Sequence, residues 1–98
     1  MIVKIAYAQG YGDSLATDLP YLLKSREDEF HTFKVILYDE EHYKSKKDAI
    51  QLKASCGAKL IPFCALYNDN KEIVKAFYSE VGECNINNIL DFIDNEMI

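Results

Sequence analysis

Residues 59 to 78, KLIPFCALYNDNKEIVKAFY, decide the fold that we predict for this chain. Lys59 to Tyr67 and Glu72 to Tyr78 are rich in β-branched and aromatic residues, which is typical of strands. The NDN sequence at 68 to 70 favours a turn, and so short a connection makes two strands antiparallel. The stretch therefore predicts a β-hairpin. Pro62 interrupts its first strand, which requires the proline to open the strand or to take the cis form in a tight bend.

The residues before the hairpin predict alternating strands and helices. Ile2 to Ala8 is a short apolar strand closed by Gly10. Asp13 or Ser14 offers an N-cap oxygen to a helix that runs to about residue 26. Its apolar stripe at helical spacing consists of Leu15, Leu19, Leu22 and Leu23. Pro20 lies inside this helix and predicts a kink.

A second strand and two further helices complete the chain. His31 to Tyr38 is the second strand, and Ser45 with Asp48 resembles a capping box for a helix that Gly57 ends. Asn85 caps the last helix, whose apolar residues fall at i, i+3, i+4 and i+7: Ile86, Ile89, Leu90 and Ile93. The order β-α-β-α-β-β-α predicts an α/β fold with a mixed four-stranded sheet flanked by helices.

Composition bounds the class of protein. Ninety-eight residues, of which 49% are hydrophobic, suit one packed domain spanning 1–98. A net charge of −5 argues against nucleic acid and anionic membranes as partners. The apolar N-terminal run is too short for a signal peptide or a membrane span. Three cysteines without close spacing argue against a disulfide framework and a zinc knuckle, and favour a reducing cytoplasm.

Three short motifs follow one another at a characteristic spacing along the second half of the chain. They are Cys56-Gly57-Ala58, Ile61-Pro62 and Val81-Gly82. In this spacing the chain resembles the thioredoxin-like family, which often has Tyr-Gly-Val, a cis-proline pair and a Val-Gly pair at these places. The resemblance covers nearly the whole chain and places Tyr7-Ala8 at the family's Trp-Ala pair. It implies a thioredoxin-like fold in which Pro62 is cis and lies opposite residues 11 to 14.

The same register places Tyr11-Gly12-Asp13-Ser14 where the family's redox Cys-x-x-Cys would stand. Disulfide exchange needs an attacking thiolate and a second thiol that resolves the mixed disulfide. A tyrosine, with a pKa of about 10, cannot supply this near neutral pH, and a serine needs an adjacent base. We therefore expect a redox-inactive domain that needs no cofactor. Without the Cys-x-x-Cys pair, this position gives no reason to expect an enzyme, although the question stays open.

Our preferred hypothesis is a module that binds a protein or peptide partner. In the family, the turn before the first helix and the backbone beside the cis-proline hold an extended peptide or glutathione. The corresponding surface here consists of Tyr11, Gly12, Asp13, Ser14, Ile61, Pro62 and Phe63. The plain alternative for GYGDS is a tight turn and a capped helix, since it lacks the Lys-Ser/Thr ending of a P-loop and Asp13 would repel an anion.

Two other functions stay open. The chain is alternatively an atypical single-thiol oxidoreductase, or a glutathione-linked protein, that uses Cys64 or Cys84. We expect Cys64 to be packed under a helix, Cys56 to have a raised pKa at a helix C-terminus, and Cys84 to be the most acidic thiol because it precedes a helix. The third possibility is a subunit of a larger assembly, which pairs through the edge of the strand Glu72 to Tyr78. The oligomeric state is left open.

Metal and anion sites are weaker candidates. His42 beside Glu40 and Glu41 offers part of a metal site, but a ligand set needs three or four converging groups, so a solvated loop is the preferred interpretation. The main basic concentration consists of Lys44, Lys46, Lys47 and Lys53. A hydrated helix face explains these lysines better than an anion patch does, and no metal is expected.

Overall fold

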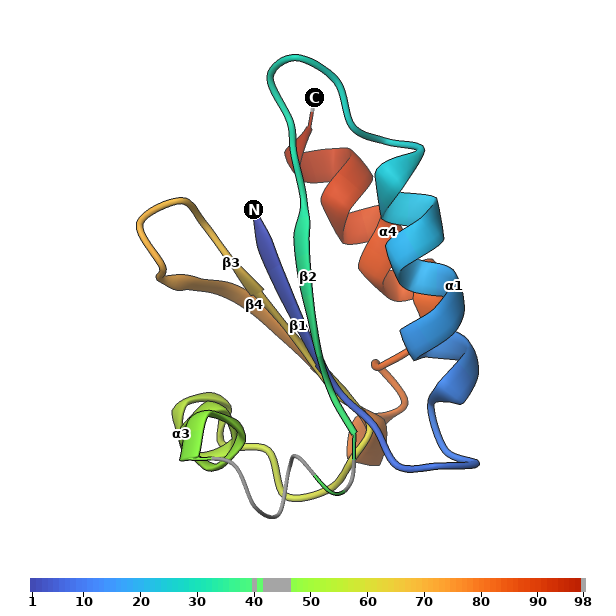
Figure 1. Cartoon of the computed structure of the whole chain (residues 1–98), viewed down its shortest axis with the longest axis vertical. Coiled ribbons are helices and arrows are strands. Elements are labelled where there is room, and N and C mark those ends of the chain that lie inside the picture. The colour runs from blue at the N-terminus through green and yellow to red at the C-terminus, as the bar shows by residue number, and fades with distance from the viewer. Residues whose placement is uncertain (40, 42–46, 98) are drawn as a thin grey trace.

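The computed structural model describes residues 1–39, 41 and 47–97. Its sheet has the strand order β2-β1-β3-β4, with α1 and α4 on one face and α3 on the other (Figure 1). The strands are β1 (Ile2–Ala6), β2 (Lys34–Tyr38), β3 (Phe63–Tyr67) and β4 (Ile73–Tyr78). The helices are α1 (Asp13–Lys24), α3 (Lys47–Cys56), α4 (Ile86–Glu96) and the short 3-10 helix η1 (Ser79–Val81). The prediction of an α/β chain with a mixed four-stranded sheet is confirmed.

Strand β1 lies inside the sheet, parallel to β2 and antiparallel to β3. The predicted hairpin is confirmed, because β3 and β4 are antiparallel neighbours. Asn68 holds their turn: its side-chain oxygen accepts the backbone N–H groups of Asn70 and Glu72, each at 3.0 Å. Such side-chain to backbone bonds are the reason that asparagine favours turns.

Two predicted strands were too long at their starts. Strand β3 begins at Phe63 and not at Lys59, so Pro62 precedes the ladder, and the Ile61-Pro62 peptide bond is cis. Strand β2 begins at Lys34 and not at His31, because the N–H of His31 donates to the Asp28 carboxylate at 2.7 Å. Backbone groups used in a local turn are not available to the sheet.

The N-termini of α1 and α4 test two capping predictions, of which one was wrong and the other is confirmed. Helix α1 has Gly12 at its N-cap and no side-chain cap, so neither Asp13 nor Ser14 caps it as predicted. In α4, Asn85 is the N-cap and accepts the N–H of Asn88 at 2.9 Å, as predicted. The capping box at Ser45 lies outside the described residues. Pro20 lies inside α1, where the expected kink stays a prediction.

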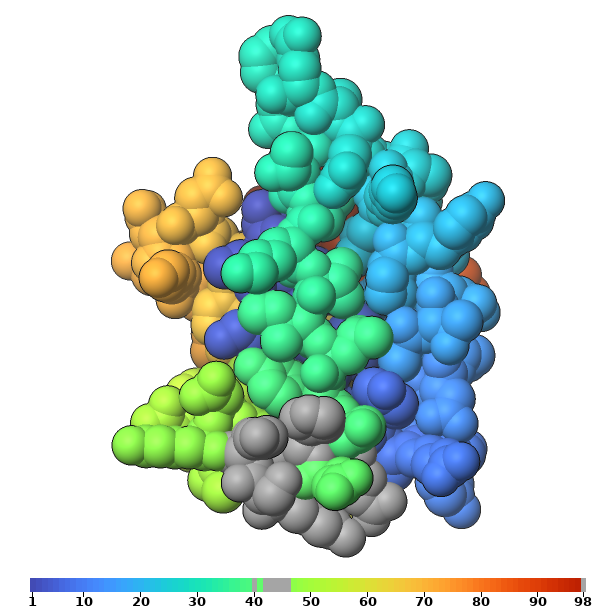
Figure 2. All heavy atoms as spheres, viewed as in Figure 1, coloured from blue at the N-terminus to red at the C-terminus, as the bar shows by residue number. Residues whose placement is uncertain are grey.

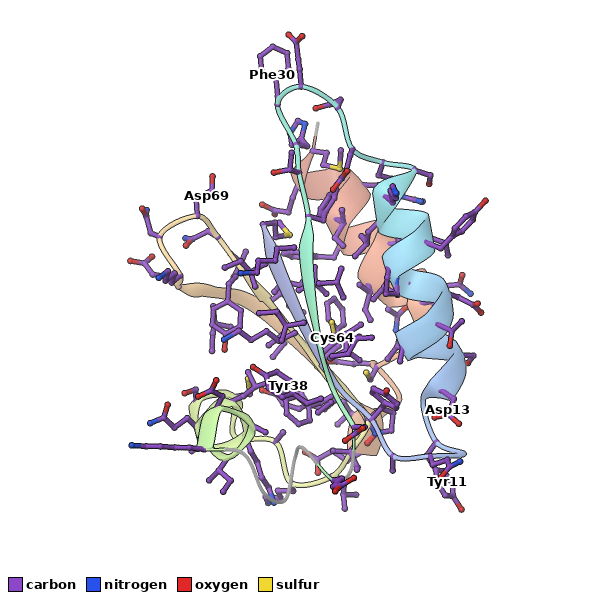
Figure 3. The ribbon with its side chains drawn as sticks, in the orientation of Figure 1. Tyr11, Asp13, Phe30, Tyr38, Cys64 and Asp69 are labelled. Atoms are coloured by element: carbon purple, nitrogen blue, oxygen red, sulfur yellow. The ribbon has the colours of Figure 1, made fainter. Side chains whose placement is uncertain are left out.

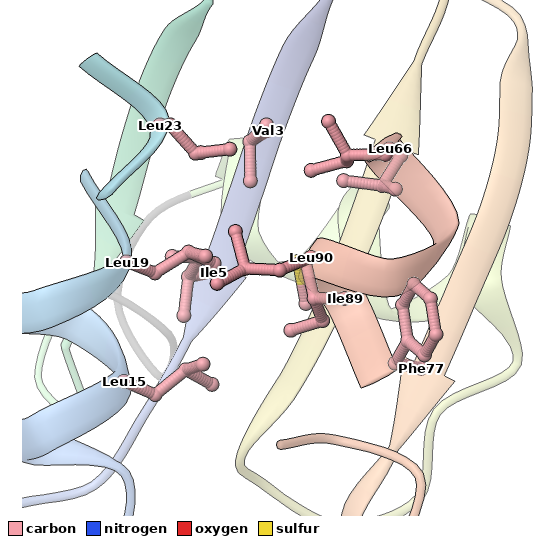
Figure 4. Close-up of a cluster of buried hydrophobic side chains, with 11 residues drawn as sticks. Val3, Ile5, Leu15, Leu19, Leu23, Leu66, Phe77, Ile89 and Leu90 are labelled. Atoms are coloured by element: carbon pink, nitrogen blue, oxygen red, sulfur yellow. The ribbon is translucent and has the colours of Figure 1, made fainter. Parts of the chain in front are cut away.

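Two groups of buried side chains occupy the two faces of the sheet. The first packs β1, β3 and β4 against α1 and α4, and Figure 4 shows Leu15, Leu19 and Leu23 of α1 directed toward Val3 and Ile5. The second lies beneath α3 and contains Ala49, Leu52 and Phe63. Burying both faces holds the ends of β1 and β3, and therefore the loops that follow and precede them, in fixed positions. Among the described residues, no helix has the length and apolar character that a membrane span requires.

Candidate functional site at the contact of Gly12 with Pro62

The turn before α1 touches Pro62. A Cβ atom added to Gly12 would lie only 2.8 Å from the Pro62 Cβ and 3.2 Å from the Tyr7 Cβ. Gly12 also has a φ of +91°, in the left-handed region where a side chain is strained. Two independent features therefore require glycine at residue 12: the left-handed backbone conformation and the close approach of Pro62.

Gly10 shows that the close approach is particular to Gly12. Its φ of +83° is similar, but a Cβ added there would meet nothing within 4 Å. The chain thus needs glycine at residue 10 for the turn alone, and at residue 12 for the turn and for contact with Pro62. The structure brings together the two segments that the sequence placed in one site.

The turn that carries Tyr11 is held by three hydrogen bonds. The backbones of Ala8 and Tyr11 bond in both directions, at 3.1 and 2.8 Å, and the N–H of Gly10 donates to the Asp13 carboxylate at 2.8 Å. Asp13 therefore closes its own loop, although we had taken it for a residue that contacts a partner. Because the loop is closed internally, its surface is organised before any partner arrives.

The exposed part of the site differs from the predicted list. Tyr11 has 73% of its surface exposed, Ser14 is exposed, and Ile61 and Pro62 are half-buried. Phe63 is completely buried in the core beneath α3, so its side chain cannot line the surface as predicted. Figure 3 shows Tyr11 and Asp13 at one end of the molecule, far from Phe30 and Asp69.

Two exposed apolar residues on segments that border Pro62 were not predicted. Leu60 is 58% exposed in the loop before Pro62, and Val81 is 62% exposed in η1. The N–H of Ser79 donates to the Pro62 carbonyl at 3.2 Å, which fixes η1 beside the proline. A signal for Leu60 was present, since it directly precedes the Ile-Pro pair, but we had assigned it to a strand.

The three thiols are free and lie outside the turn at residues 11 to 14. Cys64 is completely buried in the core under α1 and α4, as predicted, and burial raises its pKa well above the ordinary value. Burial also raises the pKa of Cys56, and it raises the pKa of Cys84 to about 12. The prediction that Cys84 is the most acidic thiol was wrong, because desolvation outweighs its place before α4.

Other candidates from the sequence find no site in the part of the chain that the structure describes. There, no group of three or more His, Cys, Asp or Glu residues converges to hold a metal ion. His42, Lys44 and Lys46 lie outside that part.

Strand β4 is at the edge of the sheet, as the assembly hypothesis requires, but it has a register irregularity opposite Leu66 and Tyr67 and an exposed Lys75. Both features discourage edge-to-edge pairing.

No protein-family model, curated protein or solved structure matches this chain. The fold defines it as a small α/β protein with a mixed four-stranded sheet. Its function must be inferred from the contact between Gly12 and Pro62 and from the exposed side chains around it.

Proposed function

We propose that this protein is a redox-inactive, thioredoxin-like domain that binds a protein or peptide partner at the contact of Gly12 with Pro62. The observation that carries the proposal is that contact, in which the N-terminus of α1 meets the segment that holds Pro62. It supports the register in which residues 11 to 14 correspond to a redox motif. In that register the two thiol positions hold Tyr11 and Ser14.

The chemistry of the site favours binding over disulfide exchange. A thiolate must form near neutral pH for exchange, whereas burial raises the pKa of each of the three thiols. The turn offers instead a highly exposed aromatic ring on a hydrogen-bonded loop. Rigid aromatic side chains are the residues that most often dominate binding energy at protein interfaces.

The apolar border of the site supports the same proposal. Leu60 lies in the loop before Pro62, Val81 lies in the short helix η1 that bonds to the Pro62 carbonyl, and each has more than half of its surface exposed. Together with Tyr11 they leave apolar surface in contact with water, which a bound partner would cover. In the family that the chain resembles, the corresponding surface holds an extended peptide, so an extended segment is the partner that we propose.

The test compares two tyrosines of equal exposure. Tyr11 is 73% and Tyr21 is 76% exposed, but Tyr21 lies along α1, away from the turn. A partner isolated by affinity capture is purified and titrated calorimetrically into the wild type, Tyr11→Ala and Tyr21→Ala. We expect Tyr11→Ala to weaken binding by about tenfold or more, which is about 1.4 kcal/mol, and Tyr21→Ala to have no effect. Equal affinities for all three proteins would refute the site.

A second test separates binding from redox chemistry. We expect no reduction of insulin by this protein in the presence of dithiothreitol above the rate without protein. Cys64→Ser combined with Cys84→Ser should leave that result, and the binding of the partner, unchanged. Reduction that disappears in the double variant would instead support the single-thiol oxidoreductase.

A further inference from the structure

We infer that a second cleft, at the opposite end of β1 from Tyr11, binds an arginine-bearing peptide segment. Four parts of the chain form it: Met1, the loop before β2, the turn between β3 and β4, and the end of α4 with Met97. Figure 2 shows the loop and the hairpin turn standing apart, with the N-terminal residues between them. The cleft has a volume of about 200 Å³. A cavity of about 150 Å³ accepts benzene, so one large side chain fits.

The walls of the cleft are apolar and adaptable. They include two aromatic rings, Phe30 and Phe33, and two thioethers, Met1 and Met97. Methionine side chains adjust their shape to different ligands, and aromatic faces attract cations. Phe30 is 81% exposed, so its ring is available at the rim.

The loop that presents Phe30 is ordered by carboxylates. Asp28 Oδ1 accepts the N–H groups of Phe30 and His31 at 2.8 and 2.7 Å, and the Glu27 carboxylate accepts the N–H of Phe33 at 3.0 Å. The ring is therefore held away from the core by its own backbone. Little conformational freedom is lost when a ligand covers such a residue.

Charge selects the ligand. Among the described residues that line the cleft, the acidic side chains are Asp69 and Glu96, the Met1 ammonium carries a positive charge, and the His31 imidazole lies 3.0 Å from Asp28; neither Lys nor Arg contributes a side chain. The ammonium group of Met1 donates to the Thr32 carbonyl at 2.9 Å and lies 3.5 Å from Asp69 Oδ1, so it offsets one of the two carboxylates and the cleft keeps an excess of negative charge. Arginine combines an apolar stem with a planar cation that pairs with carboxylates and stacks on aromatic rings.

The experiment titrates acetyl-Leu-Arg-Leu-amide into the ¹⁵N-labelled full chain and follows the backbone amide signals by NMR. We expect shifts at residues 30 to 33, 68, 69, 96 and 97, and none at residues 11 to 14. The isosteric citrulline peptide lacks the charge and should bind about three- to tenfold more weakly. Equal binding of the two peptides, or shifts confined to residues 11 to 14, would overturn the inference.

Variants of exposed carboxylates test whether the arginine peptide binds at the cleft. Asp69→Asn combined with Glu96→Gln should weaken the arginine peptide about three- to tenfold, because it removes both carboxylates. Asp18→Asn combined with Asp91→Asn, which removes exposed carboxylates of α1 and α4, should leave its affinity unchanged. Equal weakening by both pairs would mean that only the net charge matters and would refute the site. Shifts at the cleft on dilution of the protein alone would assign it to a second copy of the chain.

Discussion

The two faces of the sheet are packed by different kinds of side chains. Beneath α1 and α4 the core is made mainly of branched aliphatic residues, such as Val3, Ile5 and Leu19, which are completely buried. Beneath α3 the core consists largely of alanines and aromatic residues: Ala6, Ala49, Ala58, Ala65, Tyr38, Phe63 and Tyr67. The first face is stabilised by the close packing of aliphatic side chains. The second combines the packing of small and aromatic side chains with tyrosine hydroxyl groups.

Tyrosine side chains add polar contacts to the α3 face. The Tyr78 hydroxyl donates to the backbone carbonyl of Cys56, at the end of α3. Burial and the nearby Cys56 thiol raise the pKa of Tyr67, and the Lys4 Nζ lies 4.7 Å from the centre of the Tyr67 ring. The difference teaches that one sheet can be stabilised on one side mainly by aliphatic packing and on the other by packing combined with polar contacts of tyrosine side chains.

The largest expected effect comes from truncating one leucine on each face. Leu19→Ala removes a completely buried side chain between α1 and the sheet and should lower the free energy of unfolding by about 2 to 5 kcal/mol. Leu52→Ala, on α3, should cost about 2 kcal/mol, at the lower end of that range, because alanines make up much of the cluster beneath α3 and the helix can move inward. Urea denaturation measures both. A Leu52→Ala cost equal to or greater than that of Leu19→Ala would break the comparison.

Alkaline pH should give the second-largest effect. Desolvation by burial raises the pKa of Tyr67 from 10 to about 12, so folding favours its protonated form. That contribution to stability is complete below pH 10 and is lost as the pH rises through 12. Cys84, on the α1 and α4 face, adds a similar loss that begins near pH 9.

Variants separate these two losses. Tyr67→Phe should show a smaller fall in the urea midpoint between pH 9 and pH 12 than the wild type, and Cys84→Ala should remove the part that begins earlier. Both are compared at each pH by circular dichroism. If the urea midpoints of the wild type and Tyr67→Phe fall equally over this range, then ionisation of Tyr67 does not contribute to the loss of stability.

The sequence predicted the aliphatic face better than the α3 face, for a physical reason. Leucines and isoleucines at i, i+3 and i+4 report directly which side of α1 and α4 is buried. Helix α3 gives a weaker stripe. Its spacing predicts Ala49, Leu52 and Cys56 on one face, and Ala49 and Leu52 are indeed buried, but two of these three side chains are small and Ile50, the other large aliphatic residue, is 54% exposed. A core of alanines and tyrosines has little periodicity to detect.

The candidate site was predictable to a similar, limited extent. Gly12 and Pro62 are separated by fifty positions, and only a family resemblance placed them together. Whether a side chain there is exposed could not be predicted, so Phe63 was wrongly included and Leu60 was missed. The role of Asp13 was also missed, because its bond to the Gly10 N–H competes with helix capping, and local sequence does not decide between the two.

A smaller effect tests the polar contact of α3. Tyr78→Phe removes the hydroxyl that donates to the Cys56 carbonyl and should lower the free energy of unfolding by about 0.5 to 1.5 kcal/mol. Tyr21→Phe removes an exposed hydroxyl from α1 and is the matched control, for which no change is expected. Hydrogen exchange of the α3 amides should increase in Tyr78→Phe alone. Unchanged exchange there would show that the hydroxyl does not anchor α3.

The smallest effect belongs to the ion pair that joins α4 to the residues following α1. Arg26 Nε donates to Asp94 Oδ1 at 2.8 Å, and this hydrogen bond lowers the pKa of Asp94 below its usual 3.8. The stabilising contribution is therefore present above pH 3.8 and is lost as the pH falls below that value, the reverse of the alkaline loss at Tyr67. Asp94→Asn should be slightly less stable than the wild type at pH 7, and the two should become equal near pH 2. Because the pair is solvent-exposed, 1 M salt should shrink the difference at pH 7. A difference that is the same at pH 2 and pH 7 would mean that Asp94 stabilises the protein through packing and not through its charge.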